Sequence, residues 1–183
     1  KQSIHKIIET NYRIITPRTF IYLEPNAKSN VIFELSLGAL INVIQYNNDW
    51  VKIYLDDTNA NIGYIPKNHI TKKSDINHDW VSVAESMINT PYKWGGRDSK
   101  GIDCSALVQL SIQTKSIEFP RNTSEQRNLH YPTIDNFEEL ERGMLIFWDG
   151  HVAVSIDNRN IIHSNAHHMK TVIEPFILAN KRI

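Results

Sequence analysis

The stretch KGIDCSAL, from Lys100 to Leu107, marks the point where a polar, glycine-containing loop gives way to an apolar run. It also holds Cys104, the single cysteine in 183 residues. The run that follows predicts a helix beginning at this cysteine, with apolar positions at Leu107, Val108 and Leu110 to Ile112.

Cys104 has two opposed interpretations. A lone cysteine is usually a small buried hydrophobe that packs in the core. Against this, unpaired backbone N–H groups in the first turn of the helix favour a thiolate and lower its pKa. Polar Asp103 and Ser105 flank the cysteine, and three glycines in the loop before it allow close approach of a substrate. These features favour a nucleophile in a cleft.

The second half of the chain has a mixed pattern of elements. A helical apolar period runs from Trp80 to Ile88, with Asp79 as its N-cap and its end at Asn89 to Pro91. The segment TSEQ, starting at Thr123, has the pattern of a capping box and predicts a third helix. Four β-rich runs follow: GMLIFW, HVAVSI, NIIHSN and KTVIEPF. This order predicts an α+β fold in which three helices pack on an antiparallel sheet.

A nucleophilic cysteine needs a base that is oriented by a third group. Of eight histidines, His151 and His163 fall within strongly apolar patterns on consecutive predicted strands. With a two-residue loop between the strands, His163 would oppose Val154 and lie on the other face from His151. A three-residue loop near 157–159, or a bulge, opposes His163 to Ala153 and gives the histidines a shared face. A catalytic role requires one of these; otherwise each histidine is a solvent-facing strand residue.

Residues 1–72 have a different character. Turn residues, including Asp56 to Asn61, separate the β-rich runs YRIIT, TFIYL, NVIFEL, ALINVIQY, WVKIYL and IGYIP. Strands at this spacing predict a small β-barrel, and NNDWVKI predicts a hairpin turn followed by a strand with an aromatic anchor. Residues 73–78 are polar and without periodicity, which predicts a linker, so that residues 79–183 form a second domain.

Composition excludes several classes of protein. Lys plus Arg and Asp plus Glu both number 20, and zero net charge argues against a nucleic-acid-binding protein and a polybasic membrane anchor. No apolar run approaches the ~20 residues of a membrane-spanning helix. One cysteine excludes an internal disulfide, and a lone thiol is most easily kept in a reducing compartment. We expect a cytoplasmic protein without a cofactor, or a periplasmic or secreted one if a signal peptide precedes Lys1.

Six blocks occur in order over about residues 79–175: TPYKWGG, GIDCSALV, FPRNTSEQ, ERGMLIFW, HVAVSI and IIHSNA. They resemble the NlpC-type cysteine peptidases of bacteria, papain-like enzymes that cut cell-wall peptides. The resemblance implies that Cys104 is the nucleophile, His151 the general base and His163 the polar residue that orients the base. It also implies that the hydroxyl of Tyr92, with backbone N–H groups at the helix start, stabilises the oxyanion.

The resemblance also implies a substrate, a cell-wall peptide of the type L-Ala-γ-D-Glu-diamino acid. Asp103 and Ser105 match residues that hold the free amino group of such a peptide, since a carboxylate binds an ammonium ion strongly. The first domain resembles a bacterial SH3-like barrel, in which a tyrosine near the GYIP segment closes the substrate pocket. Tyr64 is the expected equivalent and Asn61 the alternative, and Trp94 is expected at the substrate site.

The implied reaction is hydrolysis of the γ-D-glutamyl–diamino acid bond of murein peptides, by an endopeptidase or dipeptidyl-peptidase acting in cell-wall recycling or remodelling. An N-acetylmuramoyl amidase or an acyltransferase on the same scaffold is one alternative, and a catalytically silent module that binds cell wall is another. Ala106 and Met144 depart from the family pattern, where glycine and aspartate are usual. The second departure leaves the local loop structure open.

The segment HSNAHHMK raises the possibility of a metal site. His163, His167 and His168 have spacings that zinc sites use. However, the cysteine lies about sixty residues away and no acidic ligand is evident. We therefore predict no metal site and place His167 and His168 in a loop at the rim of the cleft.

Overall fold

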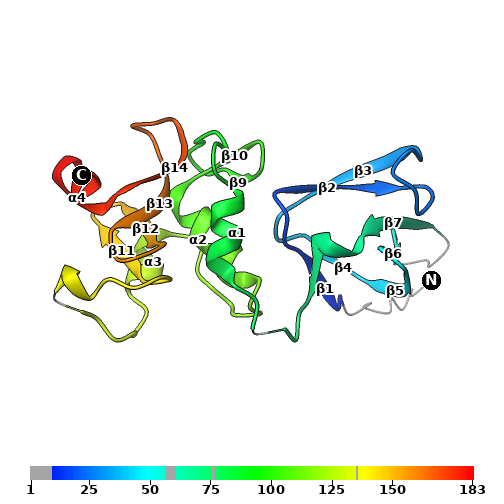
Figure 1. Ribbon diagram of the computed structural model, residues 1–183, viewed down its shortest axis with the longest axis horizontal. Helices are drawn as coiled ribbons and strands as arrows, with labels where there is room; N and C mark the ends of the chain where they lie inside the picture. The colour runs from blue at the N-terminus through cyan, green and yellow to red at the C-terminus, as the bar shows by residue number, and fades with distance from the viewer. Residues whose placement is uncertain (1–9, 57–60, 76, 135) are drawn as a thin grey trace, which may run out of the picture. The chain divides into compact units, whose positions relative to one another are not determined.

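The computed structural model describes residues 10–56, 61–75, 77–134 and 136–183 (Figure 1). The chain divides into two compact units, residues 1–76 and 77–183, and the boundary falls inside the predicted linker 73–78. Parts of the predicted barrel, residues 1–9 and 57–60, lie outside the described residues, and so does Ile76 of the predicted linker. Each unit contains its own cluster of buried hydrophobic side chains, as independent domains do.

Short antiparallel strands make up the first unit. They are β1 (Tyr12–Ile14), β2 (Arg18–Tyr22), β3 (Val31–Ser36), β4 (Leu40–Ile41), β5 (Val43–Asn47), β6 (Trp50–Tyr54), β7 (Ile62–Pro66) and β8 (Ile70–Lys72), with a 3-10 turn η1 (Lys67–His69). The predicted strands are present, although the run ALINVIQY is divided into β4 and β5. The strand pairs of the described residues form two sheets, in the orders β3-β2-β7-β6-β5 and β4-β1-β8, and do not close into one barrel.

The core of the first unit follows from the alternation of side chains along its strands. Every second residue of β6 and β7 points inward, and each fully buried aliphatic side chain contributes about 1.5–3 kcal/mol. The most buried members of this core are Ile14, Val51, Ile53 and Ile65. The predicted hairpin turn is confirmed between β5 and β6, where Asn48 has φ 52°. The ring of Trp50, the predicted anchor, lies edge-on to Tyr22 at 5.2 Å.

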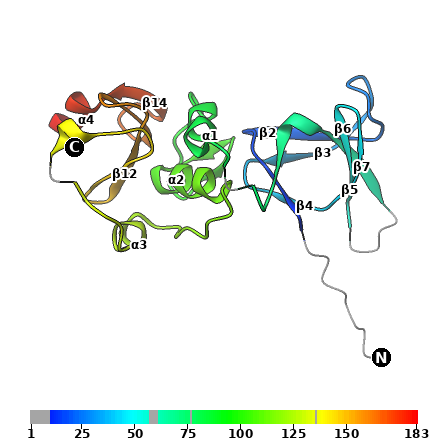
Figure 2. The same ribbon diagram turned by 60° about the horizontal axis from the view of Figure 1, so that its bottom comes forward.

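The second unit has the predicted α+β order, with a short pair of strands, a 3-10 turn and a C-terminal helix in addition. Its elements are α1 (Trp80–Ser86), β9 (Arg97–Asp98), β10 (Gly101–Ile102), α2 (Cys104–Gln113), α3 (Thr123–Arg127), η2 (Phe137–Glu139), β11 (Leu145–Trp148), β12 (His151–Ser155), β13 (Asn160–Asn165), β14 (Lys170–Pro175) and α4 (Phe176–Arg182). The strands β11-β12-β13-β14 form the predicted antiparallel meander. Helix α2 packs on β12 and β13, and α1 packs on α2 (Figures 1 and 2). Helix α4, the fourth helix, was not predicted.

The predicted start of α1 is confirmed, whereas the helix ends at Ser86, earlier than the predicted end at Asn89 to Pro91. Asp79 accepts a hydrogen bond from the backbone N–H of Val81 at 3.0 Å, which caps the helix. After α1 the chain turns through Asn89, which has φ 67°. Ile88, predicted on the buried face, is 40% exposed because the helix has already ended at Ser86.

The cap of α3 differs from the prediction by one residue. Asn122, not Thr123, is the N-cap, and the carboxylate of Glu125 accepts from the backbone N–H of Asn122 at 3.2 Å. Glu125 thus takes the part that the sequence suggested for Gln126. The shift leaves the hydroxyl of Thr123 free to reach Cys104, 3.8 Å from its sulfur.

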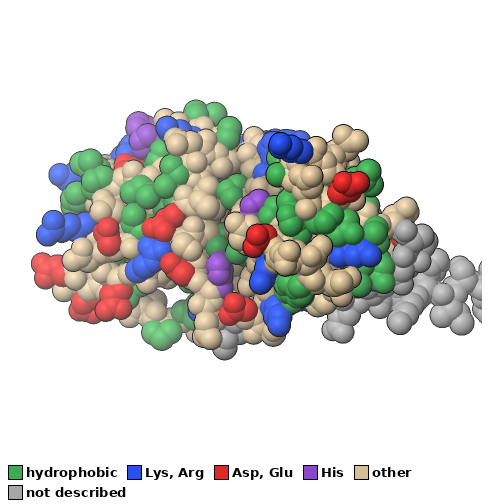
Figure 3. All heavy atoms as spheres, turned by 45° about the vertical axis from the view of Figure 1, so that its right-hand side comes forward, with side chains coloured by type: hydrophobic (Ala, Val, Ile, Leu, Met, Phe, Trp, Pro, Cys, Tyr) green, Lys and Arg blue, Asp and Glu red, His purple; other side chains and the backbone are tan. Residues whose placement is uncertain are grey.

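Charges of both signs are interspersed on the face of the molecule in Figure 3, in keeping with the zero formal net charge. Within the described ranges, no helix combines the length and the hydropathy that a membrane crossing requires.

Candidate active site

The glycine-containing loop fixes the start of α2 and therefore the position of Cys104. Asp103 is the N-cap and accepts from the backbone N–H of Ala106 at 2.8 Å. Its own backbone N–H donates to the carbonyl of Gly96 at 3.2 Å. A Cβ atom at Gly96 would collide with the carbonyl of Gly101, so only glycine fits this close approach. The predicted helix start at the cysteine is confirmed.

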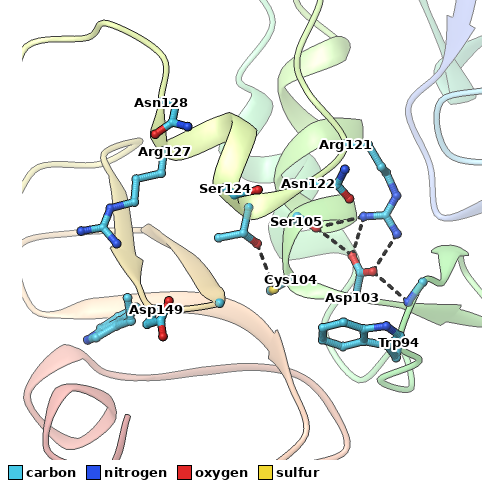
Figure 4. Close-up of a pocket in the computed structure, with 14 residues that line it drawn as sticks. Trp94, Asp103, Cys104, Ser105, Arg121, Asn122, Ser124, Arg127, Asn128 and Asp149 are labelled. Atoms are coloured by element: carbon cyan, nitrogen blue, oxygen red, sulfur yellow. Dashed lines mark hydrogen bonds and ion pairs between the residues drawn. The ribbon is translucent and has the colours of Figure 1, made fainter.

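Cys104 lines a groove of about 890 Å³ between the loop at Trp94, the start of α2, helix α3 and the β11–β12 turn (Figure 4). The cysteine is only 6% exposed, yet it borders this open space. Trp94 is 82% exposed and lies at the edge of the groove. The burial of Cys104 is therefore that of a residue lining a cleft.

The β12–β13 connection has the length that a shared histidine face requires. Val154 pairs with Ile162, and the N–H of Ile156 donates to the carbonyl of Asn160 at 3.0 Å. This register leaves residues 157–159 as a three-residue loop and opposes His163 to Ala153. The predicted loop length is confirmed.

His151 and His163 are in direct contact. The Nε2 atom of His151 lies 2.8 Å from Nδ1 of His163, and His163 is fully buried. The contact leaves Nδ1 of His151 as the ring nitrogen that is not bonded to His163. The backbone N–H of Val152, directly after His151, donates toward the sulfur of Cys104. The structure thus brings three of the four predicted catalytic residues, Cys104, His151 and His163, to the beginning of β12.

Burial is the largest cause of the pKa shifts of Cys104 and His151. It raises the pKa of the Cys104 thiol, although the N–H of Val152 and the hydroxyl of Thr123 favour the thiolate. Burial, followed by the charge repulsion from His163, lowers the pKa of His151 to about 4. The prediction that the helix N-terminus lowers the thiol pKa is therefore wrong, because desolvation outweighs it. At neutral pH the thiol and the imidazole of His151 are both uncharged.

Tyr92 is partly buried near the thiol. Its backbone N–H donates to the carbonyl of Met169 at 2.9 Å, and it forms a parallel bridge with Ile102, two residues before Cys104. Burial raises the pKa of the phenol, and negative charge on Cys104 and Asp103 raises it further. The hydroxyl therefore keeps its proton and can donate a hydrogen bond.

Asp103 and Ser105 lie in the groove, but the carboxylate is not free. Nη1 and Nη2 of Arg121 donate to the two carboxylate oxygens of Asp103 at 2.9 and 2.6 Å (Figure 4). Nη1 also donates to the hydroxyl of Ser105 at 2.9 Å. An incoming ammonium ion would meet a carboxylate–guanidinium pair, which weakens the predicted ammonium role of Asp103. The sequence analysis missed Arg121, although it lies in the quoted block FPRNTSEQ.

Two further charged residues adjoin the histidine pair and were not predicted. The Nε2 atom of His163 lies 2.7 Å from Oε1 of Glu174, on β14. Nη1 of Arg182, in the last turn of α4, donates to Oε2 of the same carboxylate at 3.0 Å. A row of hydrogen bonds therefore runs from His151 through His163 and Glu174 to Arg182.

The histidine-rich segment places one candidate metal cluster among the described residues. Donor atoms of His163, His168 and Glu174 lie within 4.8 Å of one another. The cluster includes an acidic side chain, which the sequence did not reveal, and excludes the cysteine. Both ring nitrogens of His163 are already hydrogen-bonded, so a metal would have to displace one of these bonds. His167 lines a smaller pocket of about 240 Å³ beside His151.

Tyr64 lies on β7 of the first unit, where it pairs with Tyr22 of β2 and Lys52 of β6. Asn61, the alternative, is exposed and directly precedes β7. A part for either residue in closing the substrate pocket stays a prediction.

Residues 89–176 match the model of the NlpC/P60 family. This part of the chain belongs to the NlpC/P60 family. The predicted resemblance of the second domain is confirmed, whereas the SH3-like character of the first domain stays a prediction.

Two relatives of the NlpC/P60 domain are informative. A probable endopeptidase NlpC homolog of Haemophilus influenzae is 39% identical over 88 residues, which cover 46% of this chain and 47% of the relative. Dipeptidyl-peptidase 6 of Lysinibacillus sphaericus is 27% identical over 154 residues, which cover 78% of this chain and 56% of the relative. The chain thus spans about half the length of these curated relatives.

The fold has a counterpart among solved structures. The crystal structure of an NlpC/P60 family protein from Bacillus cereus superposes with a TM-score of 0.76 and 24% sequence identity. The match covers 91% of this chain and 58% of that chain. It shows that the fold of the chain is shared with that protein.

Proposed function

We propose that the NlpC/P60 domain is a cysteine peptidase that hydrolyses the bond between γ-D-glutamate and a diamino acid in cell-wall peptides. One observation carries the proposal: the thiol at the head of α2 borders a groove and accepts from the N–H of Val152, the residue after His151, which is hydrogen-bonded to His163. A nucleophile, a base and a group that orients the base are the parts that acyl transfer requires.

The reaction would begin from uncharged partners. Nδ1 of His151 accepts the proton of Cys104 as the sulfur attacks the γ-carbonyl carbon, and a carbon–sulfur bond forms. The hydroxyl of Tyr92 and backbone N–H groups at the start of α2 donate to the oxyanion. The imidazolium of His151 then protonates the leaving amine as the carbon–nitrogen bond breaks. In the second half, His151 takes a proton from water as the water oxygen attacks the thioester carbon. The carbon–sulfur bond then breaks, the γ-carboxyl product leaves and the imidazolium returns the proton to the sulfur.

The names of the relatives favour a peptidase, and one of them favours the removal of a dipeptide. The alignment with dipeptidyl-peptidase 6 covers 78% of the chain, which is more than the second unit alone contains. We therefore extend the proposal to release of the dipeptide L-Ala-γ-D-Glu from a free N-terminus, with an SH3-like first unit contributing to the choice of substrate. Asp103, whose charge is paired with Arg121, and Ser105, which accepts from Arg121, would form the polar wall of the groove on the acyl side.

The test compares three substrates by mass spectrometry: free L-Ala-γ-D-Glu-diaminopimelate, its N-acetylated form and intact sacculi. We expect release of the dipeptide from the free peptide and loss of this turnover in Cys104→Ala, with an unchanged circular dichroism spectrum. Cleavage between sugar and peptide would instead indicate an N-acetylmuramoyl amidase. Transfer to an added amine without hydrolysis would indicate an acyltransferase, and wild-type activity in Cys104→Ala would refute the assignment of the nucleophile.

A further inference from the structure

We propose that Glu174 is a positioning residue that fixes the tautomers of the two active-site histidines, and that Arg182 holds Glu174 in place for this task. The inference deepens the proposed function and rests on it, since it concerns the base of the same site. It begins from the row of hydrogen bonds that continues beyond His163.

The sheet places Glu174 within reach of His163. On β14, Glu174 pairs with Ile161 and Val172 pairs with His163, so Glu174 is the diagonal neighbour of His163 on the same face. The side chain of Glu174 is only 10% exposed. The chain then continues directly into α4, whose last turn brings Arg182 back to both carboxylate oxygens of Glu174.

The carboxylate is ionised and therefore acts only as an acceptor. Burial alone would raise the pKa of Glu174, but the hydrogen bonds from Arg182 and His163 outweigh burial and lower the pKa. An ionised carboxylate cannot donate, so the hydrogen between Glu174 and His163 belongs to Nε2 of His163.

This assignment determines the protonation of both rings. A neutral imidazole carries one hydrogen, so a proton on Nε2 leaves Nδ1 of His163 as an acceptor. The partner at 2.8 Å, Nε2 of His151, must then be the donor. His151 consequently presents an unprotonated Nδ1, which is the form that a general base needs. Without the carboxylate, the opposite tautomer of both rings satisfies the same His151–His163 bond but places a hydrogen on Nδ1 of His151.

Among the described residues, no second anionic side chain lies near the ring of His163 and could replace Glu174. The charged or titratable groups near the ring are His151 on β12, His168 in the β13–β14 turn and Arg182 on α4. His168 lies 3.9 Å from the carboxylate of Glu174 and 3.1 Å from the side-chain oxygen of Asn165. A loss of Glu174 would therefore leave His163 among groups that are neutral or positive.

A purely structural role is the alternative, in which the Glu174–Arg182 pair only ties α4 to β14. The same unit offers a matched control, because Glu85 forms a comparable pair with Arg142, with oxygen–nitrogen distances of 2.8 and 2.9 Å. Glu85 lies on α1 and belongs to no part of the proposed site. Glu85→Gln breaks an ion pair of the same kind without touching a histidine.

The decisive experiment records the ring nitrogens by NMR in the full chain labelled with ¹⁵N-histidine. In the wild type and Glu85→Gln we expect both active-site rings to carry their hydrogen on Nε2. In Glu174→Gln the amide can donate as well as accept, so we expect a mixture of tautomers. Turnover of the free peptide should fall about 10- to 100-fold in kcat, as when the hydrogen-bond partner of a metal-bound histidine is lost, while KM changes little. Glu174→Asp, which keeps the charge, should recover part of the loss.

The outcomes separate this inference from the proposed function. If the wild type does not cleave the peptide but Glu174→Gln still changes the tautomers, the substrate assignment fails and the positioning role stands. If the wild type cleaves the peptide and Glu174→Gln keeps wild-type tautomers and kcat, the positioning role is refuted. Should Glu174→Gln fail to fold, Arg182→Gln gives the same readouts, with a smaller change in tautomers expected. Unchanged tautomers in a folded Arg182→Gln with a tenfold loss of kcat would also overturn the proposal.

Discussion

Acidification should destabilise the second unit because His151 is held uncharged in the folded protein. Its pKa is about 4 in the folded chain, compared with 6.5 for an unperturbed histidine. Between these values the unfolded chain binds a proton that the folded chain does not, so stability falls as pH drops below 6.5 and levels off near pH 4. The full shift corresponds to about 3 kcal/mol, an upper value because the ring is partly exposed.

The loss of stability in a pH range suited to unfolding experiments follows from the folded and unperturbed pKa values of His151. Between about pH 7 and about pH 5, the proton binding of His151 should reduce the free energy of unfolding by about 2 kcal/mol. His163, whose pKa burial also lowers, adds to the decrease in the same direction. Glu174, whose folded pKa is lowered from 4.5, contributes mainly below this range.

The assay is urea unfolding followed by tryptophan fluorescence at several pH values. The background Trp50→Phe removes the tryptophan of the first unit, so that Trp80, Trp94 and Trp148 report the second unit. His151→Gln should show a pH dependence that is flatter by about 2 kcal/mol over this range. The exposed residue His130 provides the control variant His130→Gln, which should keep the wild-type slope. Parallel slopes for the wild type and His151→Gln would refute the claim that His151 is buried uncharged.

Three further results are expected from the same geometry. The value of kcat/KM for peptide cleavage should fall on acidification with a midpoint near pH 4, where His151 becomes protonated; a midpoint near 6.5 would contradict this. Tyr92→Phe removes one oxyanion donor and should reduce kcat about 100-fold with little change in KM; an unchanged kcat in steady-state kinetics would exclude Tyr92 from that part. Asp103→Ala removes the cap of α2 and leaves Arg121 unpaired, so urea unfolding should show a loss of about 3 kcal/mol. Asp98→Ala, in the exposed β9, is the comparison, and equal losses in both variants would contradict the reasoning.

The local features of the site could be predicted because short-range sequence rules determine them. The N-cap Asp103 and the apolar period after it place Cys104 at the head of α2. The period of two along strands and the length of the connection place His151 and His163 on one face. Both arguments involve residues that are close in the chain, where backbone geometry leaves few alternatives.

The remaining features depend on contacts between segments that the sequence pattern does not connect. Arg121 reaches Asp103 across 18 residues, and Glu174 reaches His163 across a strand pair. Helix α4 is short and begins after Pro175, so it lacks the long apolar period that identifies a helix. The direction of the Cys104 pKa was predicted wrongly because the sequence shows the helix start but not the degree of burial.

The loop 157–159 illustrates how the geometry of a site can depend on a segment that does not line it. Surface connections usually accept insertions and deletions without harm. Here, adding or deleting one residue would rotate the whole of β13 by half a period, and His163 would turn away from its partner. Loop length is thus a quantity that evolution would have to preserve at this hairpin, because a change in it would separate the two histidines while leaving Cys104 untouched.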